Sequence, residues 1–142
     1  MERSLILVKP DAVTRGLAGT IISRIEDSGL KMLALKMLHI NQDLATRHYA
    51  AHQEKPFFAG LIAYITSAPV VAAVFEGEDA VGRLRTLMGP TNPTQAEPGT
   101  LRHDFGLDIE HNAIHGSDSV ETAEKEITLF FDKLELMYYE RV

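Results

Sequence analysis

The feature that most constrains the fold is a run of four apolar residues near the start of the chain, Leu5–Val8, which ends at Lys9 and Pro10. A short apolar run without polar alternation, followed by a proline, is typical of a buried central strand. Helices must pack on the sheet that contains such a strand, so strands and helices are both expected along the rest of the chain.

The remaining hydrophobic pattern predicts two more strands and five helices. In chain order they are a helix over 16–28, a strand over 31–40, helices over 43–52 and 57–65, a strand over 70–75, a helix over 78–88 and a last helix from Asp118 or Ser119. Asp43 is the expected N-cap of the second helix, and Asp118 with Glu121 has the spacing of a capping box. These elements predict an α/β or α+β fold, with helices packed on one sheet.

Some segments carry more detailed expectations. One face of the strand over 31–40 is expected to hold Met32, Ala34, Leu38 and Ile40. The apolar stripe of the last helix is expected to run from Val120 to Leu134. The stretch 89–103 has no period, and a loop of that length in a compact domain is usually functional or disordered. The tail 134–142 is either an interface or a frayed end.

Length and composition bound the class of protein. A chain of 142 residues fits one domain over 1–142, and 14 basic against 20 acidic residues give a net charge of −6. That charge disfavours general nucleic-acid binding but does not exclude a small cationic pocket. The lack of cysteine excludes disulfides, thiolate zinc sites and cysteine nucleophiles. No segment is apolar enough for a membrane span or a signal-peptide core, so a cytoplasmic location is expected.

Familiar ligand motifs are missing from the sequence. It contains neither the G-x-x-x-x-G-K-[ST] nor the G-x-G-x-x-G phosphate-binding loop. His48 and His52 are four residues apart, a spacing that suits a metal on one helix face. The glutamate of H-E-x-x-H and an evident third ligand are both missing, so a solvated or ligand-facing helix surface is preferred to a zinc site.

His115 is the strongest single candidate for chemistry. It lies in a short extended run that turns into a helix N-terminus, where N–H groups and the helix dipole favour an anion and disfavour imidazolium. Gly116 is expected to open one approach to the ring, and Glu126 to fold back and orient it. The alternative is a polar turn whose serines only cap the helix.

Several cations and aromatic residues complete the candidates. The available anion clamps are Lys9, Arg83, Arg85, Thr91 and Arg102. The long loop can bring Arg85 and Arg102 together, and a guanidinium fork suits phosphate oxygens. Taken singly, each arginine is better explained as a solvated surface charge. Tyr49, Phe57 or Phe58 could stack on a base, although the local pattern favours core packing.

With these parts assembled, the sequence resembles the nucleoside diphosphate kinases over essentially the whole chain. The string Asn112–Ser119 reads Asn-Ala-Ile-His-Gly-Ser-Asp-Ser, which is similar to that family's active-site signature, N-x-x-H-G-S-D-S. Further similar segments, in the family's order, are Lys9–Val13, Pro56–Phe58, Gly60–Leu61, Thr91–Pro93 and Pro98–Arg102. The departures are few, namely Ile109 where many relatives carry valine, and His111 before Asn112.

The resemblance implies both a fold and a reaction. The fold is α+β, a ferredoxin-like four-stranded antiparallel sheet covered by helices, with 112–115 as the fourth strand. The reaction is a ping-pong cycle in which His115 accepts the γ-phosphoryl group of a nucleoside triphosphate and passes it to a diphosphate, while Glu126 and Ser117 hold the imidazole. The implied nucleotide-binding residues are Lys9, Tyr49, His52, Phe57, Leu61, Arg85, Thr91, Arg102, Ile109 and Asn112.

Cofactors and partners follow from the same resemblance. Mg²⁺ is expected on the phosphates of ATP or another nucleotide, without a carboxylate cage of its own. Members form homo-oligomers, tetramers or hexamers built from a shared dimer, and they maintain nucleoside triphosphate pools. No membrane and no specific nucleic acid is expected. The alternative is a ferredoxin-like regulatory module that binds nucleotides without turnover.

Overall fold

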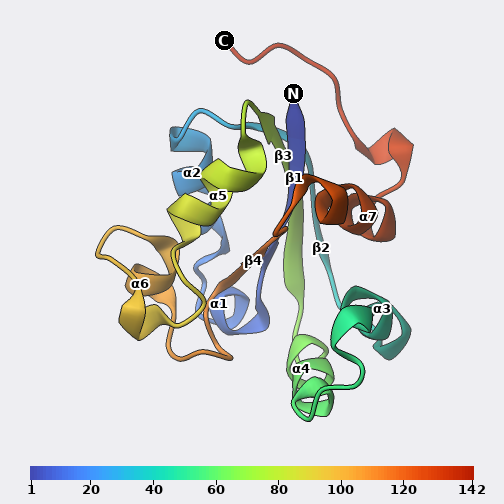
Figure 1. Cartoon of the computed structure of the whole chain (residues 1–142). Coiled ribbons are helices and arrows are strands. Elements are labelled where there is room, and N and C mark those ends of the chain that lie inside the picture. Colours follow the sequence, from blue (N-terminus) through green and yellow to red (C-terminus); the bar gives the residue numbers. More distant parts are fainter.

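The computed structural model describes residues 1–142, with one four-stranded sheet at its centre in the order β2-β3-β1-β4 (Figure 1). The strands are β1 (Glu2–Val8), β2 (Lys31–Leu38), β3 (Val70–Gly77) and β4 (Ile114–Gly116). All neighbouring pairs are antiparallel. The predicted four-stranded antiparallel α+β sheet is confirmed, and its fourth strand begins two residues later than expected.

Helices cover both faces of this sheet. They are α1 (Pro10–Thr14), α2 (Ala18–Asp27), α3 (Gln42–His48), α4 (Phe58–Ile65), α5 (Ala80–Met88), α6 (Leu101–Phe105) and α7 (Val120–Phe130), with short 3-10 helices at η1 (Ala50–His52), η2 (Pro93–Gln95) and η3 (Lys133–Glu135). In Figure 1, α2 and α5 lie on one side of the strands, and α3 and α7 lie on the other. Every helix is too short or too polar to cross a membrane.

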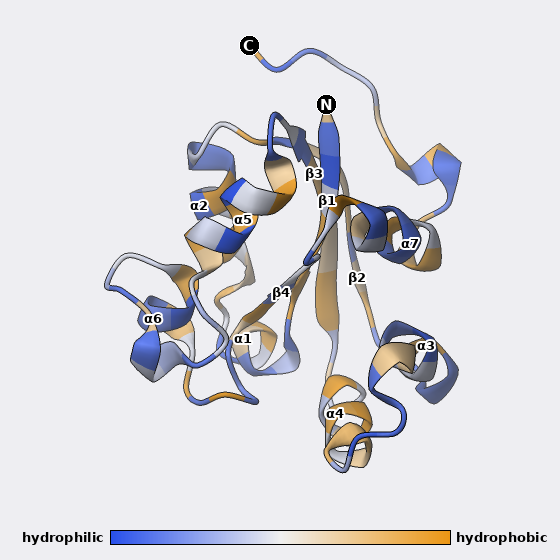
Figure 2. Ribbon diagram, viewed as in Figure 1, coloured by the Kyte–Doolittle hydropathy of each residue, from blue (hydrophilic) through white to orange (hydrophobic).

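The central strand β1 explains the unbroken apolar run. Leu5 and Leu7 belong to the core that includes residues of α3 and α7, whereas Ile6 and Val8 belong to the core that includes residues of α2 and α5. Successive side chains of a strand point to opposite faces, and helices cover both faces, so all four residues are fully buried. Apolar residues likewise dominate much of β3 (Figure 2).

The edge strand β2 departs from the predicted alternation. Its pairing with β3 is irregular between Met32 and Ala34, which leaves Leu33 as an extra residue. An extra residue reverses the faces beyond it, so Ala34 shares a core with Leu33 while Met32 packs against the opposite core. The prediction that Met32 shares a face with Ala34 was therefore wrong. Leu38 and Ile40 do lie with Ala34.

One predicted helix cap is wrong, and one predicted capping box does not form. Asn41, not Asp43, caps α3, because its side chain accepts a hydrogen bond from the N–H of Leu44 at 2.8 Å. Ser119 caps α7 by accepting from the N–H of Thr122 at 3.0 Å, so Asp118 does not form a capping box. All four residues are of types that cap helices well, so the local sequence indicates that a cap is present but not which residue forms it.

The last helix is shorter than its apolar stripe suggested. It ends at Phe130, and Leu134 lies beyond it with 92% of its surface exposed. The tail then returns toward β2, where the N–H of Met137 donates to the carbonyl of Leu33 at 2.8 Å. Arg141 donates to the carbonyl of Leu30 at 2.8 Å, so the tail is anchored and not frayed. Its role as an interface stays a prediction.

Two short helices escaped prediction. α1 and α6 have five residues each, too few to display a 3.6-residue hydrophobic period. α6 begins inside the stretch 89–103, where the side chain of Thr100 caps it. This stretch is thus an ordered connection, and α6 carries Arg102 toward β4.

Candidate active site

His115 lies in the middle of β4, where it pairs with Leu7 of β1. Its side chain, 23% exposed, contacts α3 and α7 residues on one face of the sheet. Gly116 belongs to the opposite face, where an added Cβ would meet Sδ of Met88 at 2.5 Å. The glycine therefore makes room for Met88, and the prediction that it opens an approach to His115 was wrong.

Glu126 of α7 holds the imidazole of His115. Its two carboxylate oxygens lie 3.1 and 3.0 Å from Nε2 of the ring. The hydroxyl of Ser117 donates to Oε1 of Glu126 at 2.6 Å and accepts from the N–H of Leu5 at 3.2 Å. The expected trio of His115, Glu126 and Ser117 is thus brought together, and β1 anchors it.

The charge of Glu126 decides which nitrogen of His115 is free. Burial alone would raise the pKa of this carboxyl, but hydrogen bonds from His115 and Ser117 hold it below the ordinary value. The resulting carboxylate is an acceptor, so Nε2 of His115 carries the proton that it donates. The lone pair of the neutral ring is then on Nδ1.

A strained turn precedes β4. Ala113 has a φ of 74°, and the N–H of Ile114 donates to the carbonyl of Asn112 at 2.9 Å, which makes a γ-turn. Such a conformation costs of order 1–3 kcal/mol. The N–H of Lys9 donates to the carbonyl of Ala113 at 2.8 Å and helps to hold the turn. The turn sets the spacing of Asn112 and His115, and no local signal predicted it because alanine seldom has a positive φ.

Lys9 begins a hydrogen-bonded chain beside this turn. Its Nζ donates to Oδ1 of Asn112 at 2.8 Å, and Nδ2 of Asn112 donates to the carbonyl of Thr91 at 2.9 Å. Burial, reinforced by the nearby charge of Arg102, lowers the pKa of Lys9 to about 8. Three predicted nucleotide-binding residues, from the end of β1, the long loop and the γ-turn, are therefore linked by hydrogen bonds.

Two guanidinium groups lie along the free edge of β4. Because His115 pairs with Leu7, the carbonyls of Ile114 and Gly116 point away from β1. Arg102 donates to the carbonyl of Ile114 at 2.8 Å, and Arg85 reaches the carbonyl of Gly116 at 3.4 Å. The long loop thus brings the two arginines to one strand edge, as predicted.

Arg102 is not a solvated surface charge. It is only 6% exposed, and its Nε has no hydrogen-bond partner in the protein. Burial, with a smaller contribution from Arg85, lowers the pKa of Arg102 to about 10, which leaves the guanidinium charged at neutral pH. A buried cation without a carboxylate partner is suited to an anionic ligand.

His48 is the neighbour of His115 that sequence reasoning missed. The two rings meet edge to face, 4.7 Å between centroids, and Nδ1 of His48 lies 3.6 Å from Oε2 of Glu126. Burial, followed by the charge of His115, lowers the pKa of His48 to about 3, so its ring is neutral. The apolar residues Leu44 and Ala45, one turn earlier in α3, were the signal that this position faces inward.

The proposed spacing of His48 and His52 on one helix is not realised. α3 ends at His48, and His52 lies in the separate η1. The expected helix over 43–52 is therefore broken. The metal-compatible neighbours of His48 are instead His115 and Glu126, because ligand atoms of all three lie within 4.8 Å of one another.

A wall of aromatic and apolar residues continues from the histidines. Ring centroids of Tyr49 and His52 lie 6.3 Å apart, and those of His52 and Phe57 lie 5.8 Å apart. Burial raises the pKa of Tyr49 to about 12, so its hydroxyl keeps its proton. Phe57 is 48% exposed, so the local preference for core packing was wrong for it, whereas Phe58 packs against the core.

Leu61 and Ile109 come from different segments. Leu61 is half-buried in α4, one helical turn after Phe57, and it packs against the core. Ile109 lies in the loop after α6 and is 58% exposed. The structure therefore offers exposed apolar surface at both Phe57 and Ile109, the two residues expected to enclose a base.

The residues around His115 do not form a cage for Mg²⁺. That ion prefers oxygen ligands in octahedral geometry, but Glu126 already accepts hydrogen bonds from His115 and Ser117. The carboxylate of Asp11 is likewise engaged, by Tyr64 and by Arg15. The surrounding cations suit phosphate oxygens instead.

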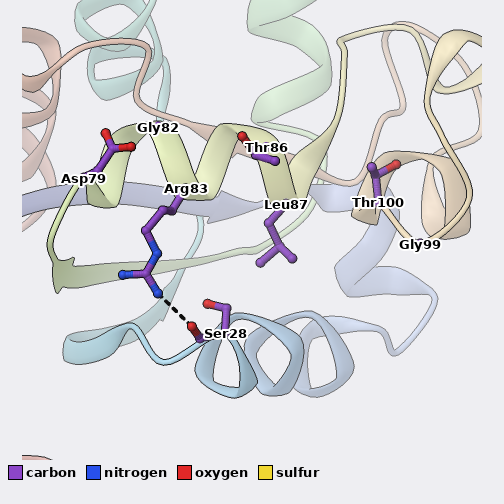
Figure 3. A pocket seen from close by; sticks show the side chains of 8 residues that line it. All are labelled: Ser28, Asp79, Gly82, Arg83, Thr86, Leu87, Gly99 and Thr100. Atoms are coloured by element: carbon purple, nitrogen blue, oxygen red, sulfur yellow. Dashed lines mark hydrogen bonds between the residues drawn. The ribbon is translucent and has the colours of Figure 1, made fainter.

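A polar hollow of about 370 Å³ lies elsewhere, between the end of α2 and α5 (Figure 3). Arg83 of α5 reaches the carbonyl of Ser28 at 2.7 Å there. None of the expected catalytic or nucleotide-binding residues lines this hollow. Arg83 is therefore separated from the anion clamps of β4 and binds backbone instead.

The fold and the site define an α+β protein in which an oriented histidine faces a cluster of cations. A model of the nucleoside diphosphate kinase family matches residues 2–136 of this chain. The nucleoside diphosphate kinase of Dehalococcoides mccartyi is 57% identical to it over 141 residues, which is 99% of both chains. That of Archaeoglobus fulgidus is 55% identical over 99% of this chain and 93% of the relative.

A solved structure agrees with these sequence matches. A halophilic nucleoside diphosphate kinase from Halobacterium salinarum, in complex with CDP, superposes with a TM-score of 0.96 at 51% identity and covers 99% of this chain and 93% of its own. The chain belongs to the nucleoside diphosphate kinase family and is a phosphotransferase enzyme. The resemblance read from Asn112–Ser119 is confirmed.

Proposed function

We propose that this chain moves the γ-phosphoryl group of a nucleoside triphosphate to a nucleoside diphosphate through a phosphohistidine at His115. The observation that carries the proposal is the contact between Nε2 of His115 and Glu126, 3.0 Å long. Nε2 carries a proton that it donates to the carboxylate of Glu126, so the lone pair of Nδ1 is the nucleophile.

Each half-reaction exchanges one bond to phosphorus. In the first, Nδ1 of His115 bonds to the γ-phosphorus, and the bond from that phosphorus to the β–γ bridging oxygen breaks. The diphosphate leaves with the electron pair, while the carboxylate of Glu126 stabilises the positive charge that develops on the ring. In the second, a terminal oxygen of another diphosphate attacks the phosphohistidine, and Nδ1 regains its lone pair. The two steps make a ping-pong cycle.

The cations are proposed to align and stabilise the phosphates. Phosphoryl transfer requires positioning and charge stabilisation more than covalent help from the protein. Arg85 and Arg102 at the edge of β4 supply positive charge, and the unpartnered Nε of Arg102 is available to a phosphate oxygen. Thr91 and His52 are proposed to bind the same phosphates. Mg²⁺ would arrive on the nucleotide and add further positive charge.

The rest of the nucleotide is assigned to the neighbouring elements. Lys9 and Asn112, already bonded to each other, are proposed to reach the ribose hydroxyls and the adjoining phosphate. Tyr49, whose ring lies near that of His52, is proposed to lie close to the phosphates. The exposed ring of Phe57 would stack on the base, with Ile109 opposite and Leu61 beside it. Stacking uses the π-face that every base has, which favours broad base acceptance.

The proposal also covers the domain extent, the oligomeric state and the location of the enzyme. We infer one nucleoside diphosphate kinase domain over residues 1–142, assembled into a tetramer or hexamer built from dimers. The enzyme would maintain nucleoside triphosphate pools in the cytoplasm. The exposed apolar residues Leu35 and Met37 on the edge strand β2 support an association of chains there.

A single-turnover experiment tests the central step. The protein is mixed with γ-labelled ATP and Mg²⁺, and label is expected on the protein, stable in alkali, lost in acid and chased into GTP by GDP. His115→Ala should bind nucleotide and take up no label. Label retained by His115→Ala would move the nucleophile elsewhere. Nucleotide binding without any label on the wild-type protein would instead support a regulatory module.

A further inference from the structure

We propose that His48, His115 and Glu126 form a binding site for Zn²⁺, and that zinc bound there inhibits phosphoryl transfer. The site is defined by Nδ1 of His48, Nε2 of His115 and a carboxylate oxygen of Glu126. The site lies on the sheet face that carries α3 and α7. Its ligands are imidazole nitrogens and a carboxylate, whereas magnesium in a nucleotide complex is bound by phosphate oxygens. The inhibitory part of this inference rests on the proposed phosphohistidine, whereas the binding part does not.

The spacing of the three ligand atoms fits a tetrahedral metal. With bonds of about 2.0–2.2 Å, two ligands of tetrahedral zinc lie roughly 3.4 Å apart. Oε2 of Glu126 is 3.0 Å from Nε2 of His115 and 3.6 Å from Nδ1 of His48. All three ligand atoms lie within 4.8 Å of one another. The two imidazole nitrogens, up to 4.8 Å apart, would have to approach by up to about 1.4 Å to reach that spacing, and this movement would complete three of the four positions.

His48 supplies the independent sign that something binds here. Its side chain is 1% exposed, and neither of its ring nitrogens has a hydrogen-bond partner. A buried polar group without a partner is costly, and in native structures it usually has a specific reason. The 3.6 Å separation from Glu126 is too long for a hydrogen bond but suits two ligands of one ion. A metal ion would satisfy Nδ1 directly.

Ligand chemistry selects the metal. Two imidazoles and one carboxylate are a common catalytic or open zinc set, and neutral imidazole is poorly matched to Mg²⁺. Access is through His115, whose side chain is 23% exposed. The three protein ligands come from α3, β4 and α7 and fill three of the four tetrahedral positions, which leaves the fourth to water.

Occupation of the site would oppose the transfer reaction. Zinc takes the lone pair of Nε2, so the proton of that nitrogen is released to solvent when the metal binds. Glu126 then neutralises the metal and no longer stabilises charge on the ring. A metal cation on Nε2 also withdraws electron density from Nδ1, which weakens its attack on phosphorus.

Binding is tested first without nucleotide. Zinc is titrated into the wild-type protein in competition with a chromophoric chelator, and X-ray absorption at the zinc edge counts imidazole ligands. We expect one zinc per chain with two imidazoles. His48→Phe should weaken binding by roughly 100-fold, as for the loss of one ligand of three. The matched control is His103→Gln, which removes an exposed imidazole that contacts only Asp104 and should leave affinity unchanged.

Inhibition is then measured as the rate of label transfer at a series of buffered free zinc concentrations in excess Mg²⁺. The rate of each variant is compared with the rate of the same variant without zinc. Wild type and His103→Gln should lose label transfer in parallel with zinc occupancy, and His48→Phe should need about 100-fold more zinc. His48→Asn is a second variant should the phenylalanine disturb packing. Equal zinc affinity in wild type and both His48 variants, or one imidazole per zinc, overturns the site. Full transfer at full occupancy overturns the inhibition, while failure of labelling without zinc affects only the proposed function.

Discussion

The two ends of the proposed nucleotide site are built in opposite ways. At the transfer end, His115, Glu126 and Ser117 are joined by hydrogen bonds of 2.6–3.1 Å and are anchored to the backbone of β1. At the base end, Phe57 and Ile109 are about half exposed and belong to two separate segments, the start of α4 and the loop after α6. One end is a closed polar network, and the other is open apolar surface.

This difference follows from what each end has to do. Bond exchange at phosphorus depends on alignment, and small misplacements are costly, so the nucleophile is held from several sides. Base recognition by stacking needs only a flat apolar surface and no fixed hydrogen-bond partner. Substitutions at the transfer end should therefore change kcat, whereas those at the base end should change KM.

The largest effect is expected for Glu126→Gln. The amide still accepts a hydrogen bond from Nε2 of His115 but carries no charge, so kcat should fall about 100-fold with little change in KM. Ser117→Ala removes the 2.6 Å hydrogen bond to Glu126 and the 3.2 Å one from the N–H of Leu5, and it should lower kcat about tenfold. Steady-state kinetics on folded protein, checked by thermal unfolding, measures both. An unchanged kcat in Glu126→Gln would mean that the carboxylate does not stabilise the reacting ring.

An intermediate effect is expected from the ionisation of Lys9, which lies between the two ends. Its pKa is lowered to about 8, chiefly by burial, so the free enzyme loses this positive charge as the pH rises through 8. Anionic nucleotides should then bind less well, and kcat/KM, which reports free-enzyme ionisations, should fall above pH 8. Lys9→Arg should move that decline to higher pH, because guanidinium stays charged. A flat wild-type profile from about pH 7.5 to 9.5 would contradict this role.

The smallest effect is expected for Phe57→Ala. Loss of an aromatic contact of about 0.5–1.5 kcal/mol should raise KM for ATP, GTP and CTP by roughly two- to tenfold, and by a similar factor for each base. The neighbouring Phe58→Ala is the matched control, because Phe58 packs against the core and should lower the unfolding temperature instead. A change in kcat alone, or for one base alone, would contradict the stacking role of Phe57.

Local sequence predicted those parts of the molecule that depend on local physics. The apolar run Leu5–Val8 required a central strand because only a strand covered on both faces buries four successive side chains. The string Asn112–Ser119 made His115 a candidate because the residue precedes a helix start, whereas the roles of His115 and Ser117 came from the resemblance to the family signature. The arginines at 85 and 102 were candidates because the loop between them has a limited reach.

Other features were beyond local sequence because they depend on partners far along the chain. The bulge in β2 is defined by its register with β3, and the role of Gly116 by the packing of Met88. The γ-turn at Ala113 is held in part by the N–H of Lys9, which donates to the carbonyl of Ala113 from the other end of the chain. His48 lies beside His115 and Glu126 only because α3, β4 and α7 pack together in the fold.

The sequence by itself thus determined the central strand, the kinds of element and, through the family signature, the histidine proposed to react. Each of these is decided by the spacing of apolar residues or by a short motif, which act over a few residues. Only the tertiary structure decided the burial of Arg102, the choice of Nε2 as the nitrogen of His115 that contacts Glu126, and the isolation of His48 from hydrogen-bond partners. Burial and hydrogen bonding depend on which distant segments approach one another, and that is a property of the assembled fold.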